Sequence, residues 1–228
     1  MLLLFDIDGT LLLKASREHA EALFAALRTV HGIAIPERRL EAAGMTDGAI
    51  ARAILLLAGV SAERIDARSA AVRTATVREF ARRCPTDLSA HLAPGIPAVL
   101  EQLAARADVR LSLVTGNFEP VARLKLQRAG IGRFFPAGQG GFGSDDEDRA
   151  ALPEIARRRA GRAGAPWPPE RTVVIGDTLR DIACARADGV PVIAVATGPF
   201  RAEELGEADI VLRDAHGLLE AVASLGLH

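Results

Sequence analysis

The sequence predicts an α/β fold, in which a parallel sheet has helices on both faces and an all-helical insertion follows the first strand. From residue 94 onward, strand patterns alternate with amphipathic helix patterns, which is typical of a parallel sheet. These strands are apolar throughout, as expected when both faces of the sheet are covered. Residues 14–87 show only helical periodicity. We therefore expect a core domain made of residues 1–13 and 88–228, and a helical cap domain made of residues 14–87.

Each element of the N-terminal part is predicted from a short pattern. Residues 2–7 form an apolar run that predicts a buried strand. The first helix is expected over 17–30 and the second after a turn and cap at 44–47, because apolar residues recur there at helical spacing. The third helix should end before Cys84-Pro85, since the residue preceding a proline disfavours helical geometry.

The C-terminal part begins with an amphipathic helix patterned by Ile96, Val99, Leu100 and Leu103. Further elements are expected after it, in a regular alternation. They are, in chain order, a strand at 110–115, a helix at 119–129, an apolar but glycine-broken segment at 134–143, a helix at 150–162, a strand at 172–177, a helix at 179–187, and strands at 191–196 and 209–212.

Three of the expected strands end in acidic or small polar residues. The first ends in Asp6-Ile7-Asp8-Gly9-Thr10 and the second in Thr115-Gly116-Asn117. The third ends in Gly176-Asp177-Thr178, with Asp181 one helical turn further on. Sites in open parallel sheets form at the carboxyl ends of the strands. If these strands are neighbours, we expect the polar groups to converge.

Such a cluster has a chemical use in phosphate transfer. Several carboxylates together with water suit a hard cation such as Mg²⁺, which offsets their repulsion and the charge of a phosphate. Thr115 and the N–H groups of Gly116 and Asn117, at a helix start, can hold phosphate oxygens. One aspartate can attack phosphorus, and a second acid two residues on can protonate the leaving oxygen. Each motif alone also fits a turn or a helix cap, so only their conjunction favours this chemistry.

The conjunction resembles the haloacid dehalogenase (HAD) superfamily, in particular its phosphoglycolate-phosphatase-like members with a helical cap after the first motif. The first motif is Asp6-Ile7-Asp8-Gly9-Thr10, the second centres on Thr115, and the fourth is Gly176-Asp177-Thr178-Leu179-Arg180-Asp181. The resemblance covers essentially the whole chain and implies a Rossmann-like core.

The resemblance also implies a role for each acid. Asp6 would be the nucleophile and Asp8 the general acid/base. Mg²⁺ would be held by Asp6, the backbone carbonyl of Asp8, and Asp177, with Thr10 and Asp181 close by ordering the site. The dehalogenases of the superfamily lack the second acid of the first motif, so Asp8 favours phosphate chemistry over carbon–halogen chemistry.

The third motif of this superfamily is a lysine that pairs with the nucleophile and the phosphate, and here the pattern departs. The matching region reads GFGSDDEDRAALPEI, with Arg149 and no lysine. Lys125 is the better candidate, because it lies on the apolar face of its expected helix, between Val121 and Ala129. Helical side chains lean toward the helix N-terminus, and the Thr115-Gly116-Asn117 end is about 9 Å away at a rise of 1.5 Å per residue.

Residue usage supports the same candidate. Among 28 basic residues only Lys14 and Lys125 are lysines, which suggests that a compact ammonium is needed at position 125. A lysine that snorkels from a helix edge is the alternative interpretation of Lys125. Arg149 is then the second candidate for the third-motif role.

Several other features have two interpretations. The acid run Asp145-Asp146-Glu147-Asp148 is either in contact with the metal or, as we expect, a set of solvated charges at a helix start. The basic run Arg157-Arg158-Arg159 is expected to be a solvated helix face rather than a nucleic-acid patch. Lys14 is either a substrate contact or a surface lysine. Residues 44–47 are either a specificity segment or an ordinary turn and cap. The five histidines show no ligand spacing and are assigned no role.

Composition excludes some classes of function. A formal net charge of −1 argues against a protein that binds nucleic acid or a membrane surface by bulk attraction. We expect no membrane span, because no run of about eighteen apolar residues occurs.

The start lacks the basic region of a secretion signal, so we expect a cytoplasmic protein. Cys84 and Cys184 are expected as small buried side chains in a reduced compartment. No pattern predicts an oligomeric state.

We therefore expect a Mg²⁺-dependent phosphatase that acts on a small phosphorylated metabolite through an aspartyl-phosphate, with the cap closing over the substrate. Two alternatives stay open. One is a sugar phosphomutase of similar build, in which a second hydroxyl accepts the phosphoryl group. The other is a non-catalytic protein that keeps the phosphate site.

Overall fold

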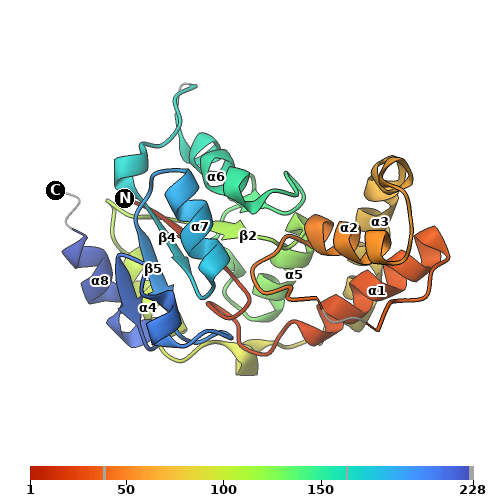
Figure 1. Ribbon diagram of the computed structural model, residues 1–228. Coiled ribbons are helices and arrows are strands. Elements are labelled where there is room, and N and C mark those ends of the chain that lie inside the picture. Colours follow the sequence, from red (N-terminus) through yellow and green to blue (C-terminus); the bar gives the residue numbers. More distant parts are fainter. Residues whose placement is uncertain (38–39, 163, 226–228) are drawn as a thin grey trace.

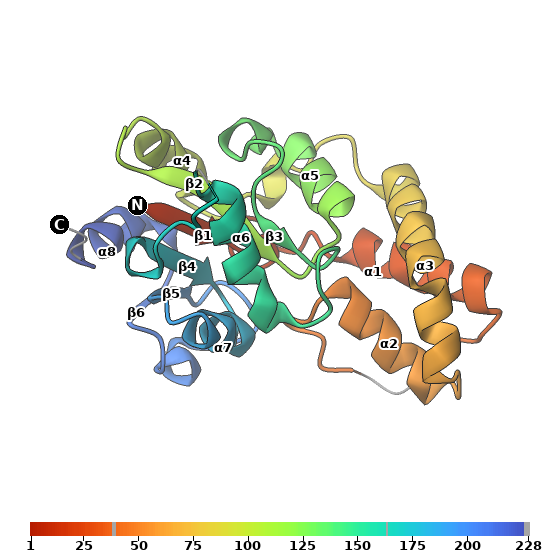
Figure 2. The ribbon, with the colours of Figure 1, turned by 90° about the horizontal axis from the view of Figure 1, so that it is seen from above.

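The computed structural model describes residues 1–37, 40–162 and 164–225, and its centre is a parallel sheet. The strands are β1 (Leu2–Phe5), β2 (Arg110–Thr115), β3 (Gly141–Phe142), β4 (Thr172–Gly176), β5 (Val192–Val195) and β6 (Ile210–Leu212). Their order in the sheet is β3-β2-β1-β4-β5-β6, and every neighbouring pair is parallel. Figure 1 shows the fold from one side, and Figure 2 labels all six strands. The first strand of the chain is therefore central, with β2 and β4 beside it.

Among the described residues, five core helices cover the two faces of this sheet. They are α4 (Ile96–Ala104), α5 (Glu119–Arg128), α6 (Leu152–Ala160), α7 (Leu179–Ala187) and α8 (Leu218–Ser224). In β1, Leu3 and Phe5 pack in one hydrophobic cluster with α4, α5 and α8. Leu2 and Leu4 pack in a second cluster with α6 and α7. Successive strand side chains point to opposite faces, and both faces are buried, so an uninterrupted apolar run is what this strand needs.

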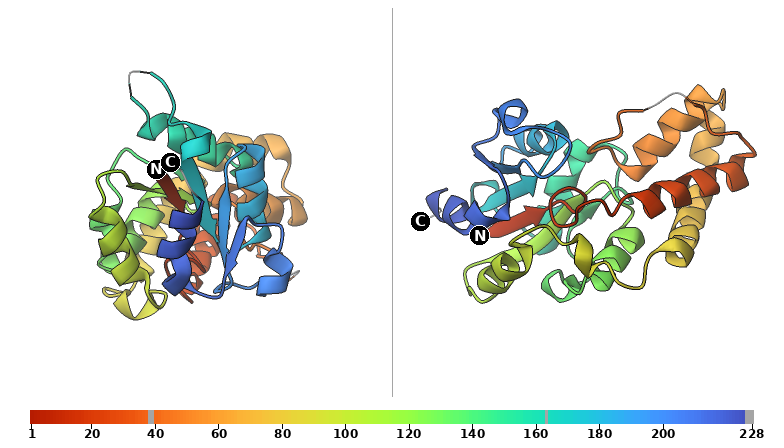
Figure 3. Two further views of the ribbon diagram at one scale, coloured as in Figure 1. Left: turned by 90° about the vertical axis from the view of Figure 1, so that its left-hand side faces the viewer. Right: turned by 90° about the horizontal axis from the view of Figure 1, so that it is seen from below.

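The insertion between β1 and α4 is helical and has a small core of its own. It contains α1 (Arg17–His31), α2 (Asp47–Leu57) and α3 (Ala62–Arg83), whose buried side chains include Leu23, Leu27, Ile54, Leu55 and Val72. Thr46 and Ser61 accept hydrogen bonds from the first turns of α2 and α3, which fixes where these two helices begin. Figures 2 and 3 show the insertion beyond the carboxyl ends of the strands, with β1 pointing toward it.

The predicted fold class is confirmed. The parallel sheet has helices on both faces and a helical insertion after its first strand, and most elements agree with the predicted ranges to within a few residues. The glycine-broken segment holds only the two-residue β3, and α8 was not predicted. Cys84 and Cys184 are buried free thiols, as expected. In the described part of the chain, no helix has the length and apolar character that a membrane span requires. The domain boundaries at residues 13 and 88 stay a prediction.

Candidate active site

The candidate site lies where the central strand leaves the sheet. Phe5, at the end of β1, is in register with Leu113 of β2 and Ile175 of β4. The three predicted motifs therefore emerge at one edge of the sheet, as the parallel topology requires. They border a cavity of about 640 Å³ between the sheet and the insertion. Its lining on the core side includes Asp6, Asp8, Gly116, Asn117, Arg149, Asp177 and Thr178.

Asp6, Asp177 and Asp181 form a buried cluster of carboxylates. Oxygen atoms of the three lie within 4.8 Å of one another, and each residue is almost inaccessible to solvent. Burial raises the pKa of Asp6 to about 6, although the Arg149 guanidinium acts in the opposite direction. Burial, reinforced by the neighbouring Asp181 and Asp6, raises the pKa of Asp177 to about 9. A cation would stabilise these acids in their ionised form, and such a set of oxygen ligands suits Mg²⁺.

The carboxylate of Asp177 has one oxygen engaged and one free. Thr10 Oγ1 donates a hydrogen bond of 2.8 Å to Asp177 Oδ1. The other oxygen, Oδ2, is buried and accepts no hydrogen bond from any residue that the structure describes. Two glycines leave room for it, because a Cβ atom would lie only 2.1 Å from Oδ2 at Gly9 and 1.7 Å from it at Gly198. A buried acceptor without a donor needs another partner, and a metal ion would provide one.

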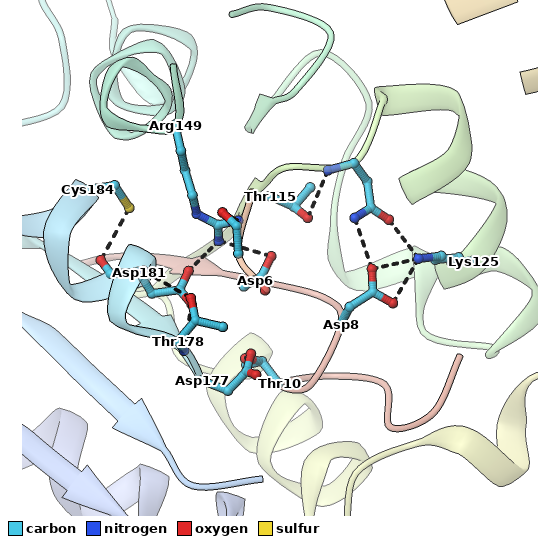
Figure 4. A network of polar contacts seen from close by, with 12 residues as sticks. Asp6, Asp8, Thr10, Thr115, Lys125, Arg149, Asp177, Thr178, Asp181 and Cys184 are labelled. Carbon is cyan, nitrogen blue, oxygen red and sulfur yellow. Dashed lines mark hydrogen bonds and ion pairs between the residues drawn. The ribbon is translucent and has the colours of Figure 1, made fainter. Parts of the chain in front are cut away.

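Arg149 is the cation on the Asp6 side of the site. Its Nη2 lies 3.3 Å from Asp6 Oδ1 and also donates to Asp181 Oδ1 (Figure 4). Asp181 Oδ2 accepts hydrogen bonds from the backbone N–H of Thr178 at 3.0 Å and from its hydroxyl at 2.6 Å, in a capping box at the start of α7. Both oxygens of Asp181 are therefore engaged, and this residue orients Arg149 against Asp6.

Asp8 lies toward α5 and has a separate cation (Figure 4). Lys125 Nζ is 2.8 Å from Asp8 Oδ1 and 2.6 Å from Oδ2, and Asn117 Nδ2 donates to Oδ2 at 2.9 Å. The ammonium also donates to Asn117 Oδ1 at 2.8 Å, and Lys125 is fully buried. Burial raises the pKa of Asp8, but the pairing with Lys125 outweighs it and holds this pKa below its ordinary value. Two acids two residues apart thus have different electrostatic surroundings.

Two insertion residues extend this network. Lys125 Nζ lies 3.2 Å from His19 Nδ1, and His19 Nε2 lies 3.0 Å from Asp47 Oδ2. An ammonium can only donate, so Nδ1 accepts and Nε2 carries the proton that bonds Asp47. Asp47 Oδ2 also accepts from Phe118 N at 2.7 Å. The sequence assigned His19 no role, although its position on the apolar face of α1 with Ala22, Leu23 and Ala26 is a signal that the ring is buried.

A sequence comparison decides the family. The profile of the family described as haloacid dehalogenase-like hydrolase matches residues 3–186, which contain all the acids described above. The chain belongs to this family. As a HAD-like hydrolase it is an enzyme, and its buried acid cluster can hold a metal ion.

Three proteins named phosphoglycolate phosphatase are similar to this HAD-like hydrolase. The protein of Rhodospirillum rubrum is 30% identical over 203 residues, which are 87% of this chain and 80% of that protein. The protein of Synechococcus elongatus is 30% identical over 136 residues, which are 59% of this chain and 60% of that protein. The match to the protein of Mesorhizobium japonicum, 32% identical over 106 residues, spans 45% of this chain and 44% of that protein. Two of these matches thus span less than two thirds of the relative.

Solved structures agree in fold with this HAD-like hydrolase. A beta-phosphoglucomutase from Clostridium difficile has a TM-score of 0.70 at 18% identity, covering 98% of this chain and 96% of its own. CbbY from Rhodobacter sphaeroides in complex with phosphate has a TM-score of 0.65 at 23% identity, covering 93% of both chains. At these identities the likeness concerns the fold.

The two candidates for the third motif occupy different places in this HAD-like hydrolase. Arg149 contacts Asp6, whereas Lys125 contacts Asp8. The predicted reach of Lys125 to the end of β2 is confirmed by its bond to Asn117. The alternative that Lys125 snorkels into solvent is wrong, because its exposed fraction is 0%.

The predicted phosphate-binding segment lies against the turn that precedes α2. Gly116 O accepts a hydrogen bond of 2.8 Å from Asp47 N. The approach is close, since a Cβ atom on Gly116 would lie 2.2 Å from Met45 O. Gly116 and Asn117 line the cavity, while Thr115 is fully buried. The structure thus brings together the second motif and residues 44–47, one interpretation of which is a specificity segment.

The two charged runs do not remain fully solvated, contrary to expectation. Arg157 is buried and makes two bonds to the carboxylate of Asp188, at 2.7 and 2.6 Å. Glu147 pairs with Arg52 of α2. A run of like charges shows no periodicity that would distinguish its inward-facing members, so this outcome depends on packing.

Proposed function

We propose that this HAD-like hydrolase is a Mg²⁺-dependent phosphatase that hydrolyses a small phosphomonoester through an aspartyl-phosphate on Asp6. The observation that carries the proposal is that Asp6 and Asp8 have different neighbouring side chains. Asp6 lies in the acid cluster beside Arg149, and Asp8 is held by Lys125 and Asn117. A nucleophile and a proton donor need different surroundings, which this arrangement supplies. The names of the three relatives support phosphate as the group transferred.

The residues present fit a divalent cation. Asp6 and the free Oδ2 of Asp177 would hold it, together with the backbone carbonyl of Asp8 that the family resemblance implies. Asp181 would orient these ligands, because its own oxygens are already occupied by Arg149 and Thr178. When bound, the cation neutralises the crowded acids and part of the phosphate charge.

The first half of the reaction forms the aspartyl-phosphate. An Asp6 carboxylate oxygen bonds to phosphorus, the bond from phosphorus to the alcohol oxygen breaks, and Asp8 delivers a proton to that oxygen. Arg149 lies beside Asp6 to balance its charge and that of the incoming phosphate. A phosphate dianion next to Asp8 favours the protonated form of this acid, because neighbouring anions resist ionisation.

The second half releases inorganic phosphate. Asp8, now a carboxylate, removes a proton from water while the water oxygen bonds to phosphorus and the bond to Asp6 breaks. Lys125 and Asn117 hold the Asp8 carboxylate in place for this step. Thr115 and the N–H groups of Gly116 and Asn117 would bind the phosphate oxygens at the end of β2.

The test is phosphate release from an aryl phosphate and from phosphoglycolate, each with Mg²⁺ and with a chelator. We expect Mg²⁺-dependent turnover, loss of turnover in Asp6→Asn, and a mass increase of one phosphoryl group on a peptide containing Asp6 after rapid acid quenching. The exposed Asp146 offers a matched control, since Asp146→Asn changes a carboxylate outside the site. Turnover that survives in Asp6→Asn, or release of the aryl alcohol without an equal amount of inorganic phosphate, contradicts the proposal.

A further inference from the structure

The cavity has two chemically different walls. The sheet side carries the acids, Arg149 and the end of β2. The insertion side is formed largely by apolar side chains of α1, of α2 and of the segment that leads into α2, namely Ala20, Leu23, Phe24, Met45 and Ile50. Four of these five, all but the nearly buried Leu23, are at least partly accessible. They therefore offer contact surface to whatever occupies the cavity.

The charged groups of the insertion wall that the structure describes are mostly engaged. His19 and Asp47 pair with each other, and Arg149 on the opposite wall is engaged by the acid cluster. Lys14 lies at the junction of the sheet and the insertion, where its residue is exposed. A carboxylate that reaches past Lys14 to the side chains of α1 and α2 would lie against an apolar surface, and a buried charge without a partner is unfavourable by several kcal/mol.

The cavity is also larger than a two-carbon acid requires. Pockets of roughly 300–1,000 Å³ hold drug-sized ligands, and this one measures about 640 Å³. A bound phosphoglycolate would leave the surface of Phe24 and Ile50 in contact with water. A longer apolar group would cover that surface and gain the corresponding transfer free energy.

We infer that the substrate is a phosphomonoester of an uncharged alcohol with an apolar chain or ring of more than two carbons, which packs on Phe24 and Ile50. This inference rests on the proposed phosphatase function and specifies its substrate class. The apolar part selects the substrate, and the sheet edge performs the chemistry that all phosphomonoesters share. Phosphoglycolate, the compound in the names of the relatives, is then hydrolysed with a lower kcat/KM than such an ester.

The test compares three esters with similar leaving groups: n-propyl phosphate, n-hexyl phosphate, and 6-phosphooxyhexanoate, which adds a terminal carboxylate to the hexyl chain. We expect kcat/KM for hexyl phosphate to exceed both other values by at least about tenfold, since each methylene in an apolar pocket contributes measurably. A higher kcat/KM for 6-phosphooxyhexanoate, or equal values for all three esters, overturns the inference.

Variants localise the effect to the insertion wall. Phe24→Ala should lower the hexyl-to-propyl ratio of kcat/KM about fivefold or more, because the side chain that covers the longer chain is removed. Ile33→Ala is the matched control, since Ile33 packs on the same insertion core as Phe24 but does not line the cavity. An unchanged ratio in Phe24→Ala, or an equal loss in Ile33→Ala, contradicts the assignment.

A binding measurement separates this inference from the proposed function. Calorimetry with n-hexylphosphonate and 6-phosphonohexanoate, neither of which can be hydrolysed, should show at least about tenfold tighter binding of the uncharged chain. If no ester is hydrolysed but this preference holds, the phosphatase proposal fails and the apolar specificity stands. If esters are hydrolysed and the carboxylated compounds bind better, the phosphatase stands and the apolar specificity fails.

Discussion

The ammonium of Lys125 lies 2.6 Å from Asp8 Oδ2, eight residues beyond the Asn117 amide that contacts the same carboxylate. The cation beside Asp6 is a different residue, Arg149, whose Nη2 is 3.3 Å from Asp6 Oδ1. Each of the two acids of the first motif thus has its own positively charged neighbour. One consequence is that substitutions of the two cations should have separable effects.

Lys125→Met should lower kcat by about 10²–10⁴-fold, because Asp8 loses the group that positions it for proton transfer. The free energy of unfolding should also fall, by roughly 2 kcal/mol. This loss of unfolding free energy is smaller than the loss expected for a fully buried ion pair, because 25% of the Asp8 side chain is exposed. Phosphate release and urea unfolding measure the two effects.

The double variant Asp8→Asn/Lys125→Met is the control for stability. It removes both charges, so it should recover part of the unfolding free energy while activity stays low. A double variant no more stable than Lys125→Met would show that the Asp8 pair is not the source of the loss.

Asp177→Asn should abolish stabilisation by Mg²⁺. In the wild type, metal that binds only the folded chain raises the free energy of unfolding by about 2.7 kcal/mol at 100 times its dissociation constant. The substituted amide would keep the bond from Thr10 but lose the anionic oxygen that Oδ2 of Asp177 supplies. Urea unfolding at increasing Mg²⁺ measures this, with the exposed Asp146→Asn as the control. A Mg²⁺ response of equal size in Asp177→Asn would remove Asp177 from the ligand set.

Asp47→Ala should destabilise the contact between insertion and core. Asp47 Oδ2 accepts from His19 and from the N–H of Phe118, both of which are buried. Each of the two donors left without a partner costs about 1–3 kcal/mol, so we expect a loss of roughly 2–6 kcal/mol in the free energy of unfolding. Asp47→Asn keeps an acceptor oxygen and should lose less. Equal losses in the two variants would contradict the role of the acceptor.

The site residues that could be predicted from the sequence are those on elements with a regular pattern. The acids were predicted because parallel strands bring their carboxyl ends to one edge, and Lys125 because helical periodicity placed it on a buried face. The contact of Arg149 with Asp6 was only a second candidate, since Arg149 begins a short 3₁₀ turn without periodicity. The His19–Asp47 pair could not be predicted, because it joins two insertion helices whose relative placement no local pattern determines.

His31 at the end of α1 should make the stability of the insertion depend on pH. The residue is buried, and its ring nitrogens have no hydrogen-bond partner among the described residues. Burial lowers the pKa of His31 below its ordinary 6.5, and the nearby Arg64 and Arg68 act in the same direction. The unfolded chain therefore binds a proton more readily than the folded chain. The contribution to stability is complete above pH 6.5 and is lost as the pH falls through the lower folded value.

The measurement is the free energy of urea unfolding between about pH 7.5 and 5.5 for the wild type and for His31→Leu. One proton contributes at most about 1.4 kcal/mol per pH unit, and we expect the wild type to lose stability relative to the variant by up to this slope below about pH 6.5. The difference between the two proteins isolates His31, because Asp6 and the other four histidines are common to both. Parallel curves over this range would show that the His31 ring accepts its proton as readily in the folded insertion as in the unfolded chain.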